Sequence, residues 1–268
     1  MDLGPDREYD VPMRKAVIYA FSLLVLVCVS YIGAYLLLGG EAHCEPSRSS
    51  SSEVALGGTP PGDRSREAGA LDEKEQKALV RWAVAAMRKA EPKAPWADTY
   101  EATATAVALE AHANPVYPRA QDGVRRTMAL VLGIAFYESN FRPDAEGDCR
   151  KKDGGTIASV SGRCKDSTAS SLCLLQVSSG NLKGLGLTRE EILRDTRVCV
   201  RAGLRLVHVS MGVCRAKAYE DRLAQYAHGG DTCGGAKGEG IMESRHRVSK
   251  AKWFFGNAEL KAVYEHDD

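Results

Sequence analysis

The spacing of apolar residues along the chain predicts a mainly helical protein. From Leu71 to Glu91, apolar side chains recur at steps of three and four residues, which is the spacing of one helix face. Pro92 and Pro95 then break the pattern, and Asp98 is the expected N-terminal cap of the next helix. The helices predicted from this spacing cover residues 71–91, 96–113, 127–139, 187–194, 198–213, 221–228 and 243–255.

The most apolar of these helices lies in the middle of the chain. From Thr127 to Phe136, apolar residues occupy nearly every face, which is typical of a helix at the centre of a domain. Asn140 can adopt the left-handed conformation that closes a helix, and Pro143 cannot continue one. Glu138 is therefore expected in the last turn of a buried helix.

The segment after Pro143 has a different pattern. Glycines and β-forming residues are interspersed over residues 145–170, which predicts an irregular loop or a short hairpin. A short apolar stretch follows at residues 171–177 and includes Gln176. Further on, Thr188 and Glu191 have the spacing of a capping box at the start of a helix.

Residues 16–38 form an uncharged, predominantly apolar run of 23 residues. At about 1.5 Å per residue, a helix of this length spans the roughly 30 Å hydrocarbon core of a bilayer. Arg14 and Lys15 precede the run, so residues 1–15 are expected in the cytoplasm and the rest of the protein outside. A cleaved signal peptide is the alternative, although its apolar region is usually shorter.

Residues 39–70 are rich in serine, glycine and proline, which predicts a flexible linker between the membrane helix and a globular domain at residues 71–268. The helices within residues 71–113 are expected to pack on the central helix. The net charge of +1 gives no overall field that attracts nucleic acid, and no nucleic-acid partner is predicted.

Glu138 is the first candidate for chemistry. The C-terminal end of a helix carries a partial negative charge, and apolar neighbours remove solvent, so both effects favour the protonated acid. A protonated carboxyl beside a cleft can donate a proton to the leaving oxygen of a glycoside. The simpler interpretation is a glutamate at a helix end that only faces water.

The globular part contains six of the eight cysteines, and an even number outside a membrane predicts disulfides. Fifteen pairings are possible. The most local is Cys149 with Cys164, and an antiparallel helix pair would bring Cys199 near Cys233. Six free thiols are the alternative. No pair has the two-residue spacing of a zinc site, so neither metal nor cofactor is predicted. The candidates are Cys149, Cys164, Cys173, Cys199, Cys214 and Cys233.

Five segments resemble the motifs of soluble lytic transglycosylases and goose-type lysozymes. Residues 138–145 resemble Glu-Ser-x-Phe-x-Pro-x-Ala, and residues 173–177 resemble Gly-Leu-Met-Gln-Ile. Residues 193–203 are similar to Leu-x-Asp-Pro-x-x-Asn-Ile-x-x-Gly, and residues 224–229 to Ala-x-Tyr-Asn-Ala-Gly. Residues 243–248 resemble Glu-Thr-x-x-Tyr-Val without its tyrosine. The resemblance covers residues 127–248, the core of the predicted domain.

The resemblance implies a lysozyme-like helical domain that acts on the glycan strands of peptidoglycan, on the outer side of the bacterial cytoplasmic membrane. Glu138 corresponds to the catalytic acid, which protonates the bond between N-acetylmuramic acid and N-acetylglucosamine. It then acts as a base on the muramyl 6-hydroxyl, and a 1,6-anhydro product forms. Gln176 and Tyr226 would line the saccharide groove, and Ser139 would orient groups near it.

The chain departs from the family pattern at two positions that are both cysteines. Cys173 stands where the family has glycine, and Cys199 stands where it has asparagine. A disulfide between them is the hypothesis that follows from the resemblance, because it would replace what those residues do. His228 is a second titratable group near the expected site, and a structural role is its simpler interpretation.

Two alternatives remain open from the sequence. A muramidase would hydrolyse the same bond, with an acidic side chain after Glu138 positioning the water. A non-catalytic module would bind peptidoglycan within an envelope assembly. The acidic residues concerned are Asp144, Glu146, Asp148 and Asp153.

Overall fold

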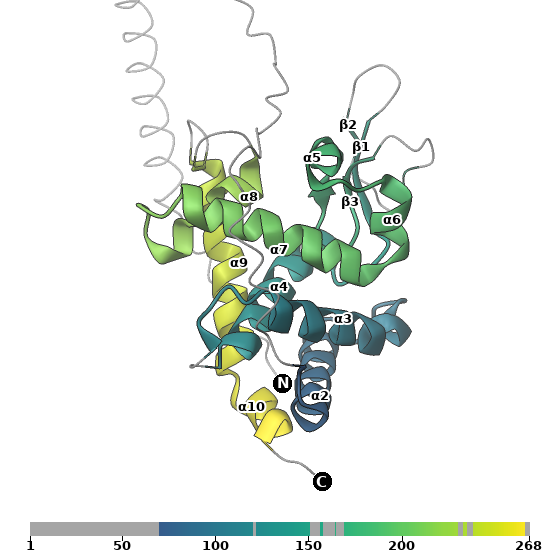
Figure 1. Cartoon of the computed structure of the whole chain (residues 1–268), viewed down its shortest axis with the longest axis vertical. Helices are drawn as coiled ribbons and strands as arrows, with labels where there is room; N and C mark the ends of the chain where they lie inside the picture. The colour runs from purple at the N-terminus through teal and green to yellow at the C-terminus, as the bar shows by residue number, and fades with distance from the viewer. Residues whose placement is uncertain are drawn as a thin grey trace, which may run out of the picture. The chain divides into compact units, whose positions relative to one another are not determined.

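The computed structural model describes residues 70–119, 122–150, 156–157, 164, 169–229, 233–234 and 238–265, and over these residues the protein is mainly helical (Figure 1). They all belong to one compact unit. The predicted cytoplasmic tail, the transmembrane segment 16–38 and nearly all of the linker lie outside the described residues. Within those ranges, every helix is too short or too polar to cross a bilayer.

The first two helices form where the sequence predicts them. Helix α2 spans Glu73–Ala90, and the side chain of Asp72 caps it by accepting the backbone N–H of Glu75 at 3.2 Å. Helix α3 spans Tyr100–Ala113 and follows a short 3₁₀ turn, η2, at Ala97–Thr99. The expected cap at Asp98 is wrong, because this residue lies inside the 3₁₀ turn and the α-helix begins after it.

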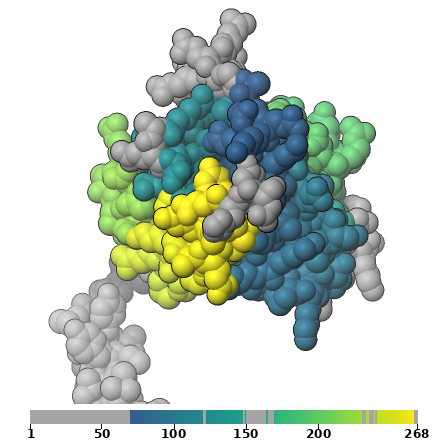
Figure 2. Space-filling model, turned by 90° about the horizontal axis from the view of Figure 1, so that it is seen from below, coloured from purple at the N-terminus to yellow at the C-terminus, as the bar shows by residue number. Residues whose placement is uncertain are grey.

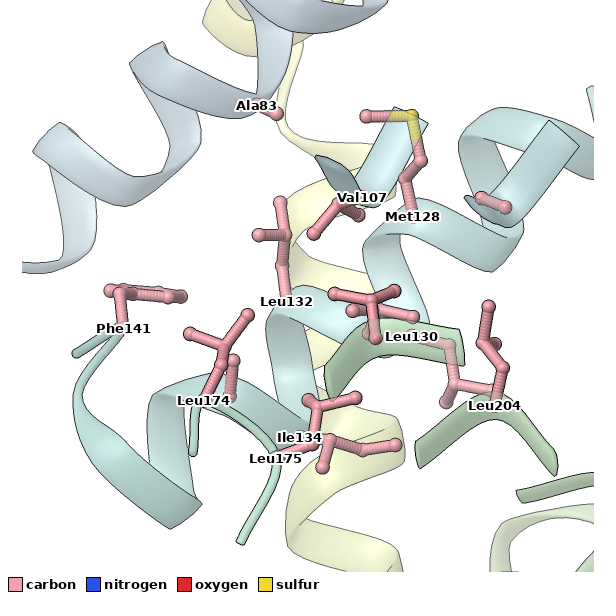
Figure 3. Packing of buried hydrophobic residues seen from close by; sticks show 14 of the residues in the cluster. Ala83, Val107, Met128, Leu130, Leu132, Ile134, Phe141, Leu174, Leu175 and Leu204 are labelled. Atoms are coloured by element: carbon pink, nitrogen blue, oxygen red, sulfur yellow. The ribbon is translucent and has the colours of Figure 1, made fainter. Parts of the chain in front are cut away.

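Helix α4, Gly123–Ser139, is the central element and begins four residues before the predicted start. Its residues from Thr127 to Ala135 are all buried, as its apolar composition predicts. Helices α2 and α3 both pack on it, and Figure 3 shows its side chains meeting those of other elements in the core. The residues that share this core include Ala83, Val107, Met128, Leu130, Leu132, Ile134, Phe141, Leu174, Leu175 and Leu204.

A small antiparallel sheet follows α4, where the sequence predicts only a loop or hairpin and an apolar stretch. Its strands are β1 (Glu146–Arg150), β2 (Thr156–Ile157), β3 (Ala169–Leu172) and β4 (Val177–Ser178), in the order β2-β1-β3-β4. Glu146 pairs with Leu172, and Leu172 pairs with Val177. The apolar stretch 171–177 is therefore not one strand, because the chain reverses within it at residues 173–176.

The next helices pack around this sheet and α3. They are η4 (Ser179–Asn181), α5 (Leu182–Leu185), α6 (Arg189–Arg194) and α7 (Thr196–Val213). The capping box of Thr188 and Glu191 is confirmed: Thr188 Oγ1 accepts the N–H of Glu191, and the Glu191 carboxylate accepts the N–H of Thr188 at 2.8 Å. The predicted start of α7 is two residues late, since Asp195 caps it.

The last part of the described chain returns to α4 and α2. Its elements are η5 (Tyr219–Asp221), α8 (Ala224–His228), α9 (Glu239–Gly256) and α10 (Ala258–Glu265). Helix α9 packs along α4, and α10 packs on α2 with an ion pair between Lys89 and Glu259. Figure 2 shows the yellow C-terminal helices beside the blue N-terminal ones. The sequence does not predict α10.

Among the cysteines that the structure describes, there are three disulfides, which confirms the disulfide prediction and decides the pairing. Cys149 bonds to Cys164, as the local spacing favours. The expected contact of Cys199 with Cys233 is wrong: Cys199 bonds to Cys173, and Cys233 bonds to Cys214 at the end of α7. Cys199 lies near the start of α7 and Cys214 directly after its end. The segment that carries Cys233 is bonded at the Cys214 end and therefore lies a helix length away from Cys199.

Candidate active site

Helix α4 ends with a sharp reversal that places Glu138 in its last turn, as predicted. Asn140 takes the left-handed conformation with φ of 50°, and Phe141 follows with φ of 67°. This second left-handed residue is unusual for a bulky side chain. It is held because the Phe141 ring is fully buried, with the Tyr100 ring edge-on at 6.0 Å.

Glu138 pairs with Arg247 of α9. The Arg247 guanidinium donates two hydrogen bonds to the same carboxylate oxygen, Oε1, from Nε at 3.0 Å and from Nη2 at 2.7 Å. The Glu138 side chain is 18% exposed and that of Arg247 9%, so solvent screens the pair only weakly. A guanidinium in this position stabilises the ionised carboxylate. From the sequence alone Glu138 is expected to be protonated, because that expectation takes no account of the positive charge of Arg247.

A glycine brings the two helices close enough for this pair. A Cβ at Gly133 of α4 would lie 2.6 Å from the backbone oxygen of Arg247, which is too short for any side chain. The close approach of α4 and α9 therefore depends on glycine at this position. Arg247 also lies 3.7 Å from Glu243, one turn earlier on α9, so it is held between two carboxylates.

Tyr226 of α8 lies near the Glu138–Arg247 pair. Burial raises the pKa of its hydroxyl well above the ordinary value, and the negative charge of Glu138 raises it further, whereas Arg247 acts in the opposite direction. The hydroxyl therefore keeps its proton, which it donates to the backbone oxygen of Leu175 at 2.5 Å. Tyr226 thus links α8 to the turn at residues 173–176.

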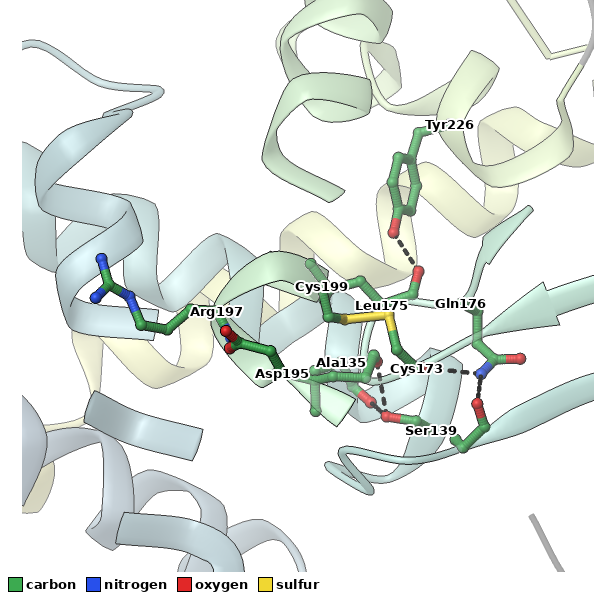
Figure 4. Close-up of a disulfide and its surroundings, with 11 residues drawn as sticks. Ala135, Ser139, Cys173, Leu175, Gln176, Asp195, Arg197, Cys199 and Tyr226 are labelled. Atoms are coloured by element: carbon green, nitrogen blue, oxygen red, sulfur yellow. Dashed lines mark hydrogen bonds between the residues drawn. A yellow bond between two sulfur atoms is a disulfide. The ribbon is translucent and has the colours of Figure 1, made fainter. Parts of the chain in front are cut away.

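The turn at residues 173–176, called the site turn below, is held by side chains from several elements (Figure 4). Ser139 Oγ lies 2.7 Å from the backbone oxygen of Leu174, and 3.2 Å from that of Ala135; its single proton favours the shorter contact. Together with Tyr226, this hydroxyl fixes two successive carbonyls of the turn. Ser139, predicted to orient groups near the groove, and Tyr226, predicted to line it, therefore both hold backbone in place.

Gln176 is the other residue predicted to line the groove, and it also holds the site turn. Its Nε2 donates to the backbone oxygens of Cys173 at 2.9 Å and of Ala145 at 3.3 Å. A Cβ at Gly147 would lie 1.9 Å from Oε1 of Gln176, so the amide packs on a glycine of β1. The Gln176 side chain therefore joins the turn to the chain that follows α4.

The Cys173–Cys199 disulfide joins the site turn to helix α7 (Figure 4). Cys173 has φ of 66°, a conformation that glycine adopts readily and other residues seldom do. The disulfide and the hydrogen bonds around it hold this conformation. The hypothesis that Cys173 and Cys199 bond to each other is confirmed.

The structure brings Glu138, the site turn, Tyr226 and Arg247 together, although they come from four segments spread over more than a hundred residues. Arg247 is the residue that the sequence analysis missed. The sequence contained a signal for Arg247. Residues 243–248 resemble a motif with a tyrosine at its fifth position, and Arg247 stands at that position.

The acidic residues after Glu138 have partners of their own where the structure describes their side chains. Asp144 accepts from Arg142 Nε at 2.9 Å. Glu146 pairs with Arg189 at 2.8 Å and accepts the N–H of Cys164 at 2.7 Å. The Asp148 side chain and the whole of Asp153 lie outside the described part, and His228 is an exposed residue at the end of α8.

No protein-family model, curated protein or solved structure matches the chain. Within the described residues, histidine, cysteine and acidic side chains do not gather in any group of three or more that is placed to hold a metal ion. The function is therefore argued from the Glu138 site itself.

Proposed function

We propose that the protein is a membrane-anchored lytic transglycosylase with a lysozyme-like domain, which cleaves peptidoglycan between N-acetylmuramic acid and N-acetylglucosamine. The observation that carries the proposal is the convergence at Glu138. Its carboxyl lies at the end of a buried helix, in contact with Arg247, and beside the site turn that Ser139, Gln176 and Tyr226 hold.

The reaction needs only one carboxyl group. Glu138 gives its proton to the glycosidic oxygen as the bond from that oxygen to C1 of the muramyl residue breaks. The resulting carboxylate takes the proton of the muramyl 6-hydroxyl while that oxygen bonds to C1. Glu138 regains its proton, no water is consumed, and the product carries a 1,6-anhydro ring.

The substrate itself favours this reaction over hydrolysis. An inverting hydrolase needs a second carboxylate to activate water, and a retaining one needs it as a nucleophile. Asp144 and Glu146, the two described candidates, are paired with Arg142 and Arg189. Because such a pair keeps a carboxylate ionised, it does not decide between the two reactions. The muramyl 6-hydroxyl is already attached to the reacting ring, and an attached group has a very high effective concentration.

The three disulfides support an extracytoplasmic location, because such bonds persist in oxidising compartments. This agrees with the membrane orientation expected from Arg14 and Lys15. We infer that the domain faces the peptidoglycan on the outer side of the bacterial cytoplasmic membrane, held by residues 16–38 through the linker at residues 39–70.

The proposal is tested by digesting purified peptidoglycan with the full-length protein and determining the products by mass spectrometry. We expect muropeptides with 1,6-anhydromuramyl ends, each lighter by one water than the hydrolysis product. Reducing ends that take up labelled solvent oxygen would identify a muramidase instead. If sacculi were bound but not cleaved by either reaction, the protein would be a binding module.

A further inference from the structure

The contact between Glu138 and Arg247 conflicts with the needs of a general acid. A general acid must carry its proton before the reaction, whereas a guanidinium that donates two hydrogen bonds to a carboxylate favours proton loss. Both side chains are largely buried, at 18% and 9% exposure, so neither water nor salt screens this effect strongly. The contact must therefore change how the protein responds to pH.

We propose that Arg247 is a positioning residue that keeps Glu138 ionised in the unliganded protein, so that glycan cleavage accelerates as the pH falls. This inference rests on the proposed function of Glu138. It concerns the regulation of the same site, because Glu138 must first bind a proton before the glycan can be cleaved.

Other charged and titratable groups also lie around the Glu138–Arg247 pair. On α9, Glu243 lies 3.7 Å from Arg247, and His246 stacks on the Tyr137 ring of α4 with ring centroids 6.1 Å apart. From α8, Tyr226 contributes a hydroxyl that stays protonated. Glu243 contacts Arg247 through Nη1, whereas Glu138 receives both Nε and Nη2.

The geometry gives Arg247 a second effect. Both of its hydrogen bonds reach Oε1, so the guanidinium fixes the rotation of the carboxyl without these bonds reaching Oε2. A proton for the glycosidic oxygen is then expected on Oε2. Arg247 would thus orient the acid as well as set the pH at which it is loaded.

The direction of the pH effect follows from the acid role. The rate of a reaction that needs protonated Glu138 falls as the pH rises through the pKa of that group. An adjacent cation places this alkaline limb of the kcat/KM profile at lower pH. Removing the positive charge should therefore move the limb upward, by about 1–3 pH units.

Arg247→Met removes the charge but keeps an unbranched apolar stem, and Arg247→Lys keeps the charge. The test compares the kcat/KM profiles of the full-length wild type and both variants on soluble glycan strands over about pH 2–9, so that a limb below the ordinary glutamate pKa of about 4.3 is covered. We expect the Arg247→Met limb to lie about 1–3 units higher and the Arg247→Lys limb to remain near that of the wild type. Coincident limbs for the wild type and an active Arg247→Met variant would overturn the inference.

A titration that needs no Arg247 variant covers the case in which Arg247→Met does not fold. The side-chain carboxyl of Glu138 is followed by carbon NMR in the wild-type protein, and Glu138→Gln assigns its signal. We expect a midpoint below about 4.3, the ordinary value for glutamate. A midpoint at or above this value would refute the inference even if cleavage were fully lost in Glu138→Gln. Cleavage by Glu138→Gln would instead refute the proposed function.

Discussion

Two glutamates of this protein are paired with arginines between helices, and they are paired differently. Glu110 of α3 is 1% exposed and receives two arginines of α7. Arg201 binds both of its oxygens, with Nε at 3.0 Å from Oε2 and Nη2 at 2.8 Å from Oε1, and Arg197 adds two bonds to Oε1. Arg247 donates two bonds to Glu138, and both go to the same oxygen, Oε1.

Under the proposed function, the difference separates a carboxylate that stabilises the fold from one that takes part in chemistry. A fork across both oxygens fixes the charge of Glu110 and ties α7 to α3. At Glu138, the two bonds from Arg247 both go to Oε1 and orient the carboxyl. The comparison therefore predicts opposite results for equivalent substitutions at the two positions.

The largest expected effect is on catalysis at Glu138. Glu138→Gln should lower the cleavage of peptidoglycan by at least about 10²–10⁴-fold, which is the usual contribution of a general acid or base. The amide oxygen can still accept from Arg247, but that guanidinium, 9% exposed, loses its main counter-charge, so unfolding free energy should fall by up to about 3–5 kcal/mol. Turnover is therefore expressed per folded molecule. Turnover is measured by release of soluble muropeptides and stability by urea denaturation.

Glu110→Gln is the matched control for that substitution. It makes the same chemical change in a similar helix-to-helix ion pair, and turnover per folded molecule should stay near the wild-type value. If both amide variants lost cleavage equally while remaining folded, the assignment of chemistry to Glu138 alone would be wrong.

The second effect concerns the stability of the α3–α7 contact. Replacing Arg197 and Arg201 together by alanine leaves the Glu110 charge buried without its guanidinium partners, and this should cost about 3–5 kcal/mol. Glu110→Gln should cost less, because the arginine side chains, 49% and 46% exposed, can turn to water. The urea midpoints of the two variants show which one is less stable. If Glu110→Gln were less stable than the double arginine variant, an unpaired buried charge at Glu110 would not be the main cost.

How far the sequence predicts the molecule depends on how local the signal is. The helix end at Glu138, the cap at Asn140 and the capping box of Thr188 were predicted correctly, because each depends on residues within a few positions. The small sheet was predicted only as a loop or hairpin, because its two- to five-residue strands leave almost no periodic pattern. Helix α10 is short and is stabilised by its packing on α2.

The candidate site shows the same limit. Glu138 was found from the end of its own helix, and Ser139, Gln176 and Tyr226 were found by resemblance. Their contacts with the site turn depend on tertiary structure, as does the close approach of α4 and α9 at Gly133. The Glu138–Arg247 pair joins residues 109 positions apart, and no local pattern predicts it.

The third effect tests the connection between the two regions. The Cys173–Cys199 disulfide attaches the site turn to α7, between Arg197 and Arg201. Replacing both cysteines by alanine should lower stability by about 2–4 kcal/mol and also lower turnover, because the site turn loses its link to α7. The loss of turnover is what distinguishes this disulfide from one that only stabilises the fold.

Cys214–Cys233 provides the control. The two bonds close loops of 26 and 19 residues, so chain entropy alone predicts stability losses that differ by only about 0.3 kcal/mol. Removal of Cys214–Cys233 should leave turnover per folded molecule unchanged. Equal losses of turnover in both double variants would mean that the site turn does not depend on its own disulfide.

The smallest effect is expected at Ser139, whose hydroxyl joins the end of α4 to the site turn. Ser139→Ala leaves the Leu174 carbonyl without this donor, which should cost about 1–3 kcal/mol if no water replaces it. Thr105→Ala of α3 is the control, since Thr105 Oγ1 donates to the Glu101 carbonyl four residues back, in the same way that Ser139 contacts Ala135. Because the turn lies beside Glu138, Ser139→Ala should reduce turnover as well as stability. In the double variant Ser139→Ala/Glu110→Gln, the two losses of unfolding free energy should add, and turnover per folded molecule should equal that of Ser139→Ala alone. A double variant with a further loss of turnover would show that the regions around Glu110 and Glu138 act as one unit, and the separation of their roles would fail.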